Sequence, residues 1–110
     1  MSRTKAVAIP REVKKAVAER DTCDGWVCCI LCGKPAPSET AWCCAHYIPR
    51  SQGGLGIEQN IITLCPDCHR DYDQSTKRAE IKTYIRAYLQ MAYTDWNEQN
   101  LTYRKDEENA

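Results

Sequence analysis

The sequence lacks surplus charge of either sign and any long apolar run. Fifteen Lys and Arg balance fifteen Asp and Glu, so a surface for a polyanion would have to be local. The longest apolar run, Val27 to Cys32, has six residues, and Met1 to Lys5 leads into no apolar segment. We therefore expect neither a signal peptide nor a membrane span, and a soluble cytoplasmic protein. At 110 residues we expect a single domain with a small core, spanning 1–110.

Cysteine, by contrast, is abundant. Eight in 110 residues is far above ordinary usage, yet short of a typical secreted disulfide scaffold. In a reducing compartment, paired Cys-x-x-Cys motifs hold zinc more often than they form disulfides. Cys29-x2-Cys32 and Cys65-x2-Cys68 together offer four thiolates to one tetrahedral ion, so we predict a closed, structural zinc site. Cys28 adjoins the first pair, but only Cys29 has the x2 spacing to Cys32.

Other interpretations of the cysteines explain the pattern less well. A redox role for either pair would need a strand-helix-strand context, which the surrounding sequence does not offer. A disulfide-linked secreted module conflicts with the absence of a signal segment. Burial as small hydrophobic side chains does not explain two matched pairs, although it suits the other four, Cys23, Cys28, Cys43 and Cys44.

The hydrophobic pattern predicts a small α+β fold. Ile9, Val13 and Val17 recur every four residues and predict an N-terminal helix within 1–20. Apolar residues at i, i+3, i+4, i+7 and i+8 predict a C-terminal helix over about 77–91. Between these helices we expect a strand entering a tight turn at 28–33, strands at 40–47 and 61–64 around a glycine-rich loop, and a helix from Pro66 through 73.

These elements divide the predicted domain into successive regions. The strand-loop-strand unit lies between the two cysteine pairs and the helix follows from Pro66, so the zinc knuckles and the ββα unit form a core at 23–75. Residues 76–103 are expected to form the C-terminal helix and a docking segment with Trp96, Leu101 and Tyr103. Residues 104–110 are polar and are expected to fray.

Basic residues concentrate at the N-terminus. Residues 1–20 carry six basic against two acidic side chains, a local balance of plus four. Such a run is usually a solvated face, but it can also contact phosphate groups. If it does, the helix residues available for phosphate contacts are Arg11, Lys14 and Lys15.

The chain has only two histidines, and both lie in or beside the predicted hairpin. His46, Asn60, His69 and Asp73 fall within 28 residues, and together they can supply a base, an orienting group and metal ligands. His69 and Asp73 are one helical turn apart, so their side chains can reach the same ion. A lone histidine more often serves the fold than binds a metal. The interpretation as a site therefore rests on finding all four residues close together in the sequence.

The segment from Ala45-His46-Tyr-Ile-Pro-Arg-Ser-Gln-Gly-Gly through Asn60-Ile-Ile-Thr-Leu-Cys-Pro-Asp-Cys-His69 resembles the HNH endonuclease family. The three letters of the family name fall on His46, Asn60 and His69, and the resemblance covers roughly residues 20–75. It implies a ββα-metal fold, here with two CxxC zinc knuckles and a flanking helix at each end, and metal-dependent cleavage of DNA. The chain ends are similar to those of small phage or prophage members, which implies a phage or bacterial-host origin.

The resemblance also implies a role for each residue. His46 is the general base that takes a proton from the attacking water. Asn60 holds the loop and so keeps His46 in place. His69 and Asp73 bind a catalytic Mg²⁺ or Mn²⁺ ion that neutralises the departing oxygen. Arg50 could reach a substrate phosphate, although a solvated arginine fits the sequence nearly as well.

One position departs from the family pattern. Many members have a second His or an Asp immediately before the base as a metal ligand, and here that residue is Ala45. The departure leaves open an alternative, a zinc-stabilised module that binds nucleic acid without cutting it. A single small site cleaves one strand, so double-strand breaks would require a homodimer or two binding events.

Overall fold

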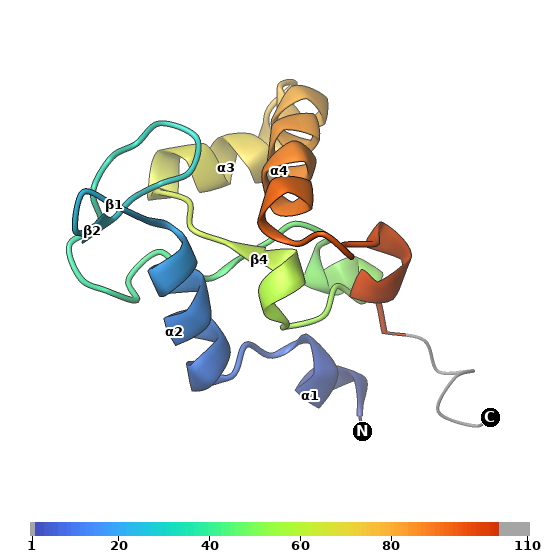
Figure 1. Ribbon diagram of the computed structural model, residues 1–110. Coiled ribbons are helices and arrows are strands. Elements are labelled where there is room, and N and C mark those ends of the chain that lie inside the picture. The colour runs from blue at the N-terminus through green and yellow to red at the C-terminus, as the bar shows by residue number, and fades with distance from the viewer. Residues whose placement is uncertain (1, 104–110) are drawn as a thin grey trace.

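The computed structural model describes residues 2–103. In Figure 1, helices α3 and α4 lie above strand β4, and α1 and α2 lie below it. The helices are α1 (Arg3–Val7), α2 (Arg11–Arg20), α3 (Pro66–Gln74) and α4 (Arg78–Ala92). The strands are β1 (Thr22–Cys23), β2 (Trp26–Val27), β3 (Ala45–His46) and β4 (Ile61–Ile62), and short 3-10 helices span Arg50–Gln52, Glu58–Asn60 and Glu98–Leu101.

The N-terminal segment forms two helices rather than the one expected within 1–20. Ser2 caps α1, its hydroxyl accepting a hydrogen bond from the Lys5 N–H. The chain is extended at Ala8 and again at Pro10, where φ is −64° and ψ is 156°. Proline disfavours helical geometry in the residue before it and has no N–H to continue a helix. Pro10 therefore separates α1 from α2.

The strands are shorter than the sequence predicted. Two antiparallel pairs form, β1 with β2 and β3 with β4. In the expected strand at 40–47 only Ala45–His46 pairs, because 39–44 form turns in which the Ser38 carbonyl accepts from the Ala41 N–H. The expected strand at 61–64 is reduced to Ile61–Ile62, and the strand expected at 28–33 is replaced by turns after a single bridge between Cys28 and Pro35.

A tight turn joins β1 and β2 into a hairpin that was not predicted from the sequence. Its two turn residues, Asp24 and Gly25, both have positive φ, 53° and 85°. This is the backbone of a two-residue hairpin turn whose twist matches that of the flanking strands, and Asp-Gly is a preferred pair for it. The Asp-Gly dipeptide was thus a usable signal for the hairpin.

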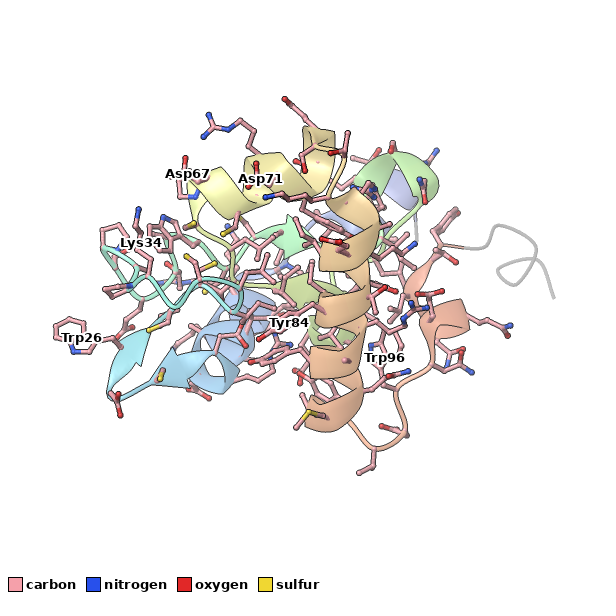
Figure 2. All side chains as sticks on the ribbon, turned by 90° about the horizontal axis from the view of Figure 1, so that it is seen from above. Trp26, Lys34, Asp67, Asp71, Tyr84 and Trp96 are labelled. Carbon is pink, nitrogen blue, oxygen red and sulfur yellow. The ribbon has the colours of Figure 1, made fainter. Side chains whose placement is uncertain are left out.

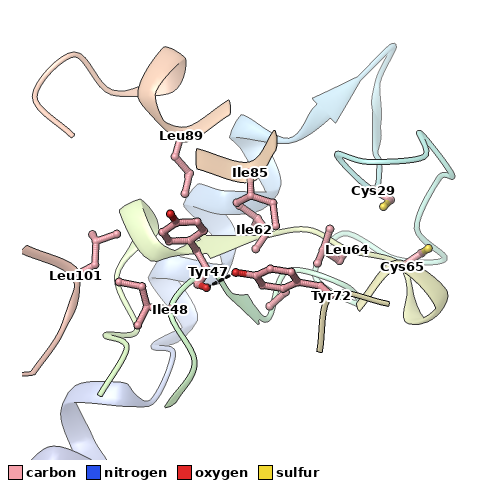
Figure 3. Packing of buried hydrophobic residues seen from close by; sticks show 11 residues of the cluster. Cys29, Tyr47, Ile48, Ile62, Leu64, Cys65, Tyr72, Ile85, Leu89 and Leu101 are labelled. Atoms are coloured by element: carbon pink, nitrogen blue, oxygen red, sulfur yellow. Dashed lines mark hydrogen bonds between the residues drawn. The ribbon is translucent and has the colours of Figure 1, made fainter. Parts of the chain in front are cut away.

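The main core lies between β4 and helices α3 and α4. Tyr72 of α3 and Ile85 and Leu89 of α4 are fully buried together with Tyr47 (Figure 3). The Tyr72 hydroxyl donates a hydrogen bond to the Tyr47 carbonyl at 2.5 Å. The α4 helix coincides closely with the segment predicted from its periodicity, and it is the apolar stripe of that helix that closes the core.

The segment after α4 docks on the loop that precedes β4. Trp96 meets the Tyr47 ring edge-on, with ring centroids 5.8 Å apart, and donates from Nε1 to the Gln59 carbonyl. Leu101 is buried, and its carbonyl accepts from the Leu55 N–H. The predicted frayed tail, 104–110, lies outside the described residues. Within 2–103, no helix combines the length and apolar character that crossing a membrane requires.

A buried carboxylate ties α2 to the rest of the molecule. Asp21 is 5% exposed and pairs with Arg20 at 2.8 Å. It also accepts hydrogen bonds from the Thr63 N–H, at 3.1 Å, and from the Tyr88 hydroxyl of α4. Because each of these donors comes from a different element, Asp21 fixes the end of α2 against the β3–β4 hairpin that carries the candidate site.

Candidate functional site

The structure brings the four cysteines of the two CxxC motifs together. Their Sγ atoms all lie within 4.8 Å of one another, and those of Cys32 and Cys65 are 3.7 Å apart. The first pair sits on a turn closed by a hydrogen bond from the Gly33 N–H to the Cys29 carbonyl. The second lies at the start of α3, where the Cys65 sulfur caps the helix by accepting from the Cys68 N–H. Figure 3 shows Cys29 and Cys65 at one edge of the core.

The chemistry of this cluster fits a metal ion such as zinc. Burial, followed by hydrogen bonds with Cys65 and Cys29, raises the pKa of Cys68 far above its usual value. Burial also acts to raise the pKa of Cys29, but hydrogen bonds from the backbone at Cys32 and Cys65 outweigh it and lower that pKa. Four thiolates at this separation repel one another, and a divalent cation relieves that repulsion.

The other cysteines do not join the cluster. Cys43 is buried, where its sulfur accepts a hydrogen bond from the Thr63 hydroxyl at 3.3 Å. Cys28 lies outside the cluster despite adjoining Cys29, and its sulfur instead contacts the Trp26 carbonyl. All eight cysteines are free thiols, and Cys23 and Cys44 are exposed.

A second group of predicted residues surrounds an open hollow of about 650 Å³. The hollow lies between the N-terminal segment, the loop after β3 and α3. The predicted site residues among its walls are His46, Arg50, His69, Asp73 and Lys14, and the other lining residues are Ala8, Ile9, Cys44, Pro49 and Ser51. Asn60 does not line the hollow, because it is fully buried beneath the loop.

His46 is oriented by the N-terminal segment. Its Nε2 atom lies 2.9 Å from the carbonyl oxygen of Val7. A carbonyl only accepts, so Nε2 carries the proton in this contact and Nδ1 is left as the basic nitrogen. Burial lowers the pKa of His46 below the ordinary value of 6.5, the Val7 contact opposes that shift, and the neighbouring Arg50 and His69 side chains add to it. This shift favours the neutral form of the His46 imidazole.

His69 and Asp73 form an adjacent pair on α3. The His69 Nε2 atom lies 3.4 Å from a carboxylate oxygen of Asp73, across one helical turn. Their side chains are 36% and 52% exposed, and both line the hollow. The pair thus presents one nitrogen and one carboxylate to solvent, while Ala45 is buried and offers no ligand. Across 2–103, the four cysteines are the one group of three or more potential ligands this close together.

Asn60 joins the two ends of the loop between β3 and β4. Its Oδ1 atom accepts from the Ile48 N–H at 2.8 Å, and its Nδ2 atom donates to the carbonyls of Ile48 and Leu55 at 3.2 and 2.9 Å. Its own carbonyl accepts from the Tyr47 N–H, next to His46. These contacts are those of a residue that holds the loop rather than of a metal ligand.

We expect Asn60→Ala to destabilise the protein by about 3 kcal/mol, because three buried backbone groups lose their partner. Urea unfolding with zinc present measures the change. Asn100→Ala, at an exposed asparagine of the last 3-10 helix, is the matched control and should stay within about 0.5 kcal/mol of the parent. Equal effects of the two substitutions would contradict the role of Asn60.

The N-terminal arm, residues 3–9, closes one side of the hollow. This contact was not predicted from the sequence. The Arg3 guanidinium donates to the carbonyls of Arg50 and Ser51 at 3.2 and 2.9 Å. The Ala6 carbonyl accepts from the Gly56 N–H at 3.0 Å. A Cβ atom on Gly56 would lie only 1.9 Å from the Ala8 carbonyl oxygen, so only glycine permits this approach.

Comparison with known proteins agrees with the geometry. Residues 29–75 match the model of the HNH endonuclease family. This segment is similar to an HNH endonuclease domain. The four clustered cysteines lie inside the match, and so do His46, Asn60, His69 and Asp73. The N-terminal arm lies outside it. The resemblance seen in the sequence is thereby confirmed, as is the small α+β fold with its cysteine cluster.

Two curated relatives share part of the chain. Anaredoxin from Nostoc sp. (strain PCC 7120 / SAG 25.82 / UTEX 2576) is 41% identical over 39 residues, which are 36% of this chain and 51% of that protein. The type IV methyl-directed restriction enzyme EcoKMcrA from Escherichia coli (strain K12) is 32% identical over 74 residues, 63% of this chain and 24% of that enzyme. The chain thus spans about half the length of the first relative and about a quarter of the second.

Proposed function

We propose that this HNH domain is a metal-dependent endonuclease that hydrolyses DNA phosphodiester bonds. The observation that supports this function best is the contact between His46 Nε2 and the Val7 carbonyl, beside His69 and Asp73. It leaves a neutral imidazole with its Nδ1 lone pair free to act as a base at the wall of an open hollow. A histidine that served only the fold would have no need of such a hollow.

The proposed reaction assigns each residue one task. His46 Nδ1 takes a proton from a water molecule as its oxygen attacks the phosphorus, and the bond from phosphorus to the 3′ oxygen breaks. His69 and Asp73 hold a divalent cation, Mg²⁺ or Mn²⁺, which supplies charge neutralisation for the departing oxygen when it is bound. Arg50 contacts a substrate phosphate from the loop, and Asn60 keeps that loop and His46 in register.

The four-cysteine cluster has a separate task in this proposal. It holds a structural zinc ion through Cys29, Cys32, Cys65 and Cys68, which links the first knuckle to the start of α3. None of the eight cysteines forms a disulfide, which suits a reducing compartment, so we propose the cytoplasm of a bacterium, with the protein encoded by the host or by a phage.

DNA is the proposed partner because basic residues surround the hollow and because one relative is named as a restriction enzyme. Contacts to phosphate from Arg11, Lys14, Lys15 and Arg50 would make binding steeply dependent on salt and weakly dependent on sequence. One such site cuts one strand, so we expect nicked rather than linear plasmid, with a homodimer required for double-strand breaks.

Cleavage of supercoiled plasmid by the zinc-loaded protein tests the proposal. We expect nicked circles to accumulate with Mg²⁺ or Mn²⁺ and not with a chelator that leaves the structural zinc bound. Failure to cut either this plasmid or a single-stranded circular DNA with any divalent cation would overturn the proposal that the protein is a nuclease. It would favour the alternative, a zinc-stabilised DNA-binding module. This alternative is supported by Ala45, a buried residue at the position where many family members have a metal ligand.

The pH dependence of cleavage provides a second test. Only unprotonated imidazole accepts a proton, so the rate falls as the pH drops through the pKa of His46. Because burial lowers this pKa below 6.5, we expect the rate constant to reach its plateau before neutral pH, with the midpoint of its fall below pH 6.5. A single-turnover pH profile at saturating Mg²⁺ measures this midpoint. A midpoint above pH 7 would contradict His46 as the base in this environment.

A further inference from the structure

Three adjoining hollows run along one side of α2, starting at the candidate active site. The hollow that contains His46 shares Ile9 and Lys14 with a second hollow of about 450 Å³. The second hollow in turn shares Lys15 with a third, of about 360 Å³, which reaches Trp26. Positions 11, 14, 15, 18 and 19 lie on one face of α2, so this helix provides a continuous wall, which Thr22 of β1 extends.

The chemical character of this path changes along its length. Near the active site the cationic side chains are those of Arg50, Lys14 and Arg11. At the far end, Glu19 and Glu39 border a pocket with an aromatic and apolar wall, and Lys15 alone is cationic. The first part therefore attracts phosphates, whereas the far pocket combines a flat apolar surface with hydrogen-bond acceptors.

Trp26 is held in an exposed position by its hairpin. Its side chain is 66% exposed, which is unusual for a residue of this size. Figure 2 shows it projecting from β2 at the rim of the molecule. The tight turn at Asp24 and Gly25 and the pairing of Cys23 with Trp26 fix the backbone of the hairpin. A rigidly presented, solvated indole ring is suited to stacking on a flat partner.

A nucleobase matches the far pocket better than a phosphate does. Its face can stack on Trp26, and its exocyclic amino groups can donate to Glu19 or Glu39, which would repel a phosphate. The ten residues of α2 span about 15 Å, or about four steps of a stacked strand at 3.4 Å each. The base in question therefore lies a few nucleotides from the phosphate at His46.

We propose that Trp26 stacks on an unpaired base of the DNA strand that the domain cleaves, while Arg11, Lys14 and Lys15 contact the intervening phosphates. The preferred substrate is then single-stranded DNA, since a paired duplex hides the faces of its bases. This inference rests on the proposed function for its substrate and adds to it the form of the DNA and a binding residue outside the HNH match.

Binding to a short fluorescent oligodeoxycytidylate, whose bases carry an exocyclic amino group, tests the inference when measured by anisotropy without added Mg²⁺ or Mn²⁺. Stacking on an aromatic side chain typically makes binding of a base about 5- to 150-fold tighter, so we expect Trp26→Ala to weaken binding by such a factor. Trp26→Phe should keep most of the affinity. Tyr84→Ala, at an exposed aromatic residue on α4, should leave binding unchanged and serves as the matched control.

An abasic strand of the same length separates stacking from every other effect of the substitution. The parent and Trp26→Ala proteins should bind it equally, because it has phosphates and no bases. Lys14→Ala should weaken binding to both strands and lower the slope of log affinity against log salt by about 0.7. Lys34→Ala, at an exposed lysine outside the three hollows, should change neither the affinity nor the salt slope.

Two results would overturn the inference. One is parent-like binding of the oligodeoxycytidylate by Trp26→Ala, and the other is an equal loss of affinity for the abasic strand. Because this assay measures no cleavage, its outcome is separate from that of the nuclease proposal. A protein that cuts no DNA but binds single strands through Trp26 would contradict the proposed nuclease activity and support the proposed stacking of a base on Trp26.

Discussion

Cys65→Ser is expected to leave the domain unfolded at room temperature. The substitution removes one of the four clustered sulfurs, whereas the serine hydroxyl can still cap α3 by accepting from the Cys68 N–H, so the variant isolates the loss of a metal ligand. Structural zinc supplies about 10–16 kcal/mol in small zinc domains, as much as the entire stability of about 5–15 kcal/mol typical of a folded protein. A core of this size cannot compensate for that loss.

Circular dichroism and zinc content of the purified protein measure this effect. The parent should hold one zinc ion per chain and lose its helical signal when a strong chelator removes the ion. Cys23→Ser, at an exposed cysteine outside the cluster, is the control and should keep both the zinc and the fold. A Cys65→Ser protein that melts at the same temperature as the parent would show that the cluster does not stabilise this fold.

His46→Ala is expected to lower the rate of metal-dependent cleavage by about 100- to 10,000-fold, the usual contribution of a positioned general base. DNA binding and zinc content should remain, because His46 lies outside the cysteine cluster. The Val7 carbonyl loses its donor, which costs about 1 kcal/mol and leaves the protein folded. Single-turnover cleavage of plasmid at equal folded concentration measures the rate.

His69→Ala distinguishes the base from a metal ligand. With Asp73 left as the one protein ligand, the variant should need more Mn²⁺ but regain cleavage as the ion concentration rises. No concentration of Mn²⁺ should restore His46→Ala. Recovery of both variants at high Mn²⁺, or of neither, would contradict the division of roles between the two histidines.

The parts of the site that depend on local sequence were predictable. The two CxxC spacings gave the right four cysteines, since each pair is formed within a single turn. The i, i+4 spacing placed His69 and Asp73 side by side, because helical geometry alone determines that contact. The length of α4 followed from its apolar periodicity for the same reason.

The parts that depend on backbone contacts between distant segments were not predictable. The partner of His46 is the carbonyl of Val7, and every residue has a carbonyl, so no side chain at that position signals the contact. The strand expected at 40–47 was too long. Its aromatic and cysteine residues are typical of strands, but in the structure most of this segment forms turns. Likewise, the hydrogen bond from Thr63 to Asp21 spans 42 positions of the chain.

The N-terminal arm sets a limit on how freely this nuclease-like core can be moved between proteins. The histidine proposed to react lies within 29–75, but the carbonyl that orients it, and the Arg3 side chain that secures the arm, lie outside that segment. Transplanting the core into a new host chain would carry over its cysteines and both histidines while leaving the tautomer of His46 unspecified. A host chain would therefore have to supply its own carbonyl in the place of that of Val7 to hold the ring of His46 in the same orientation.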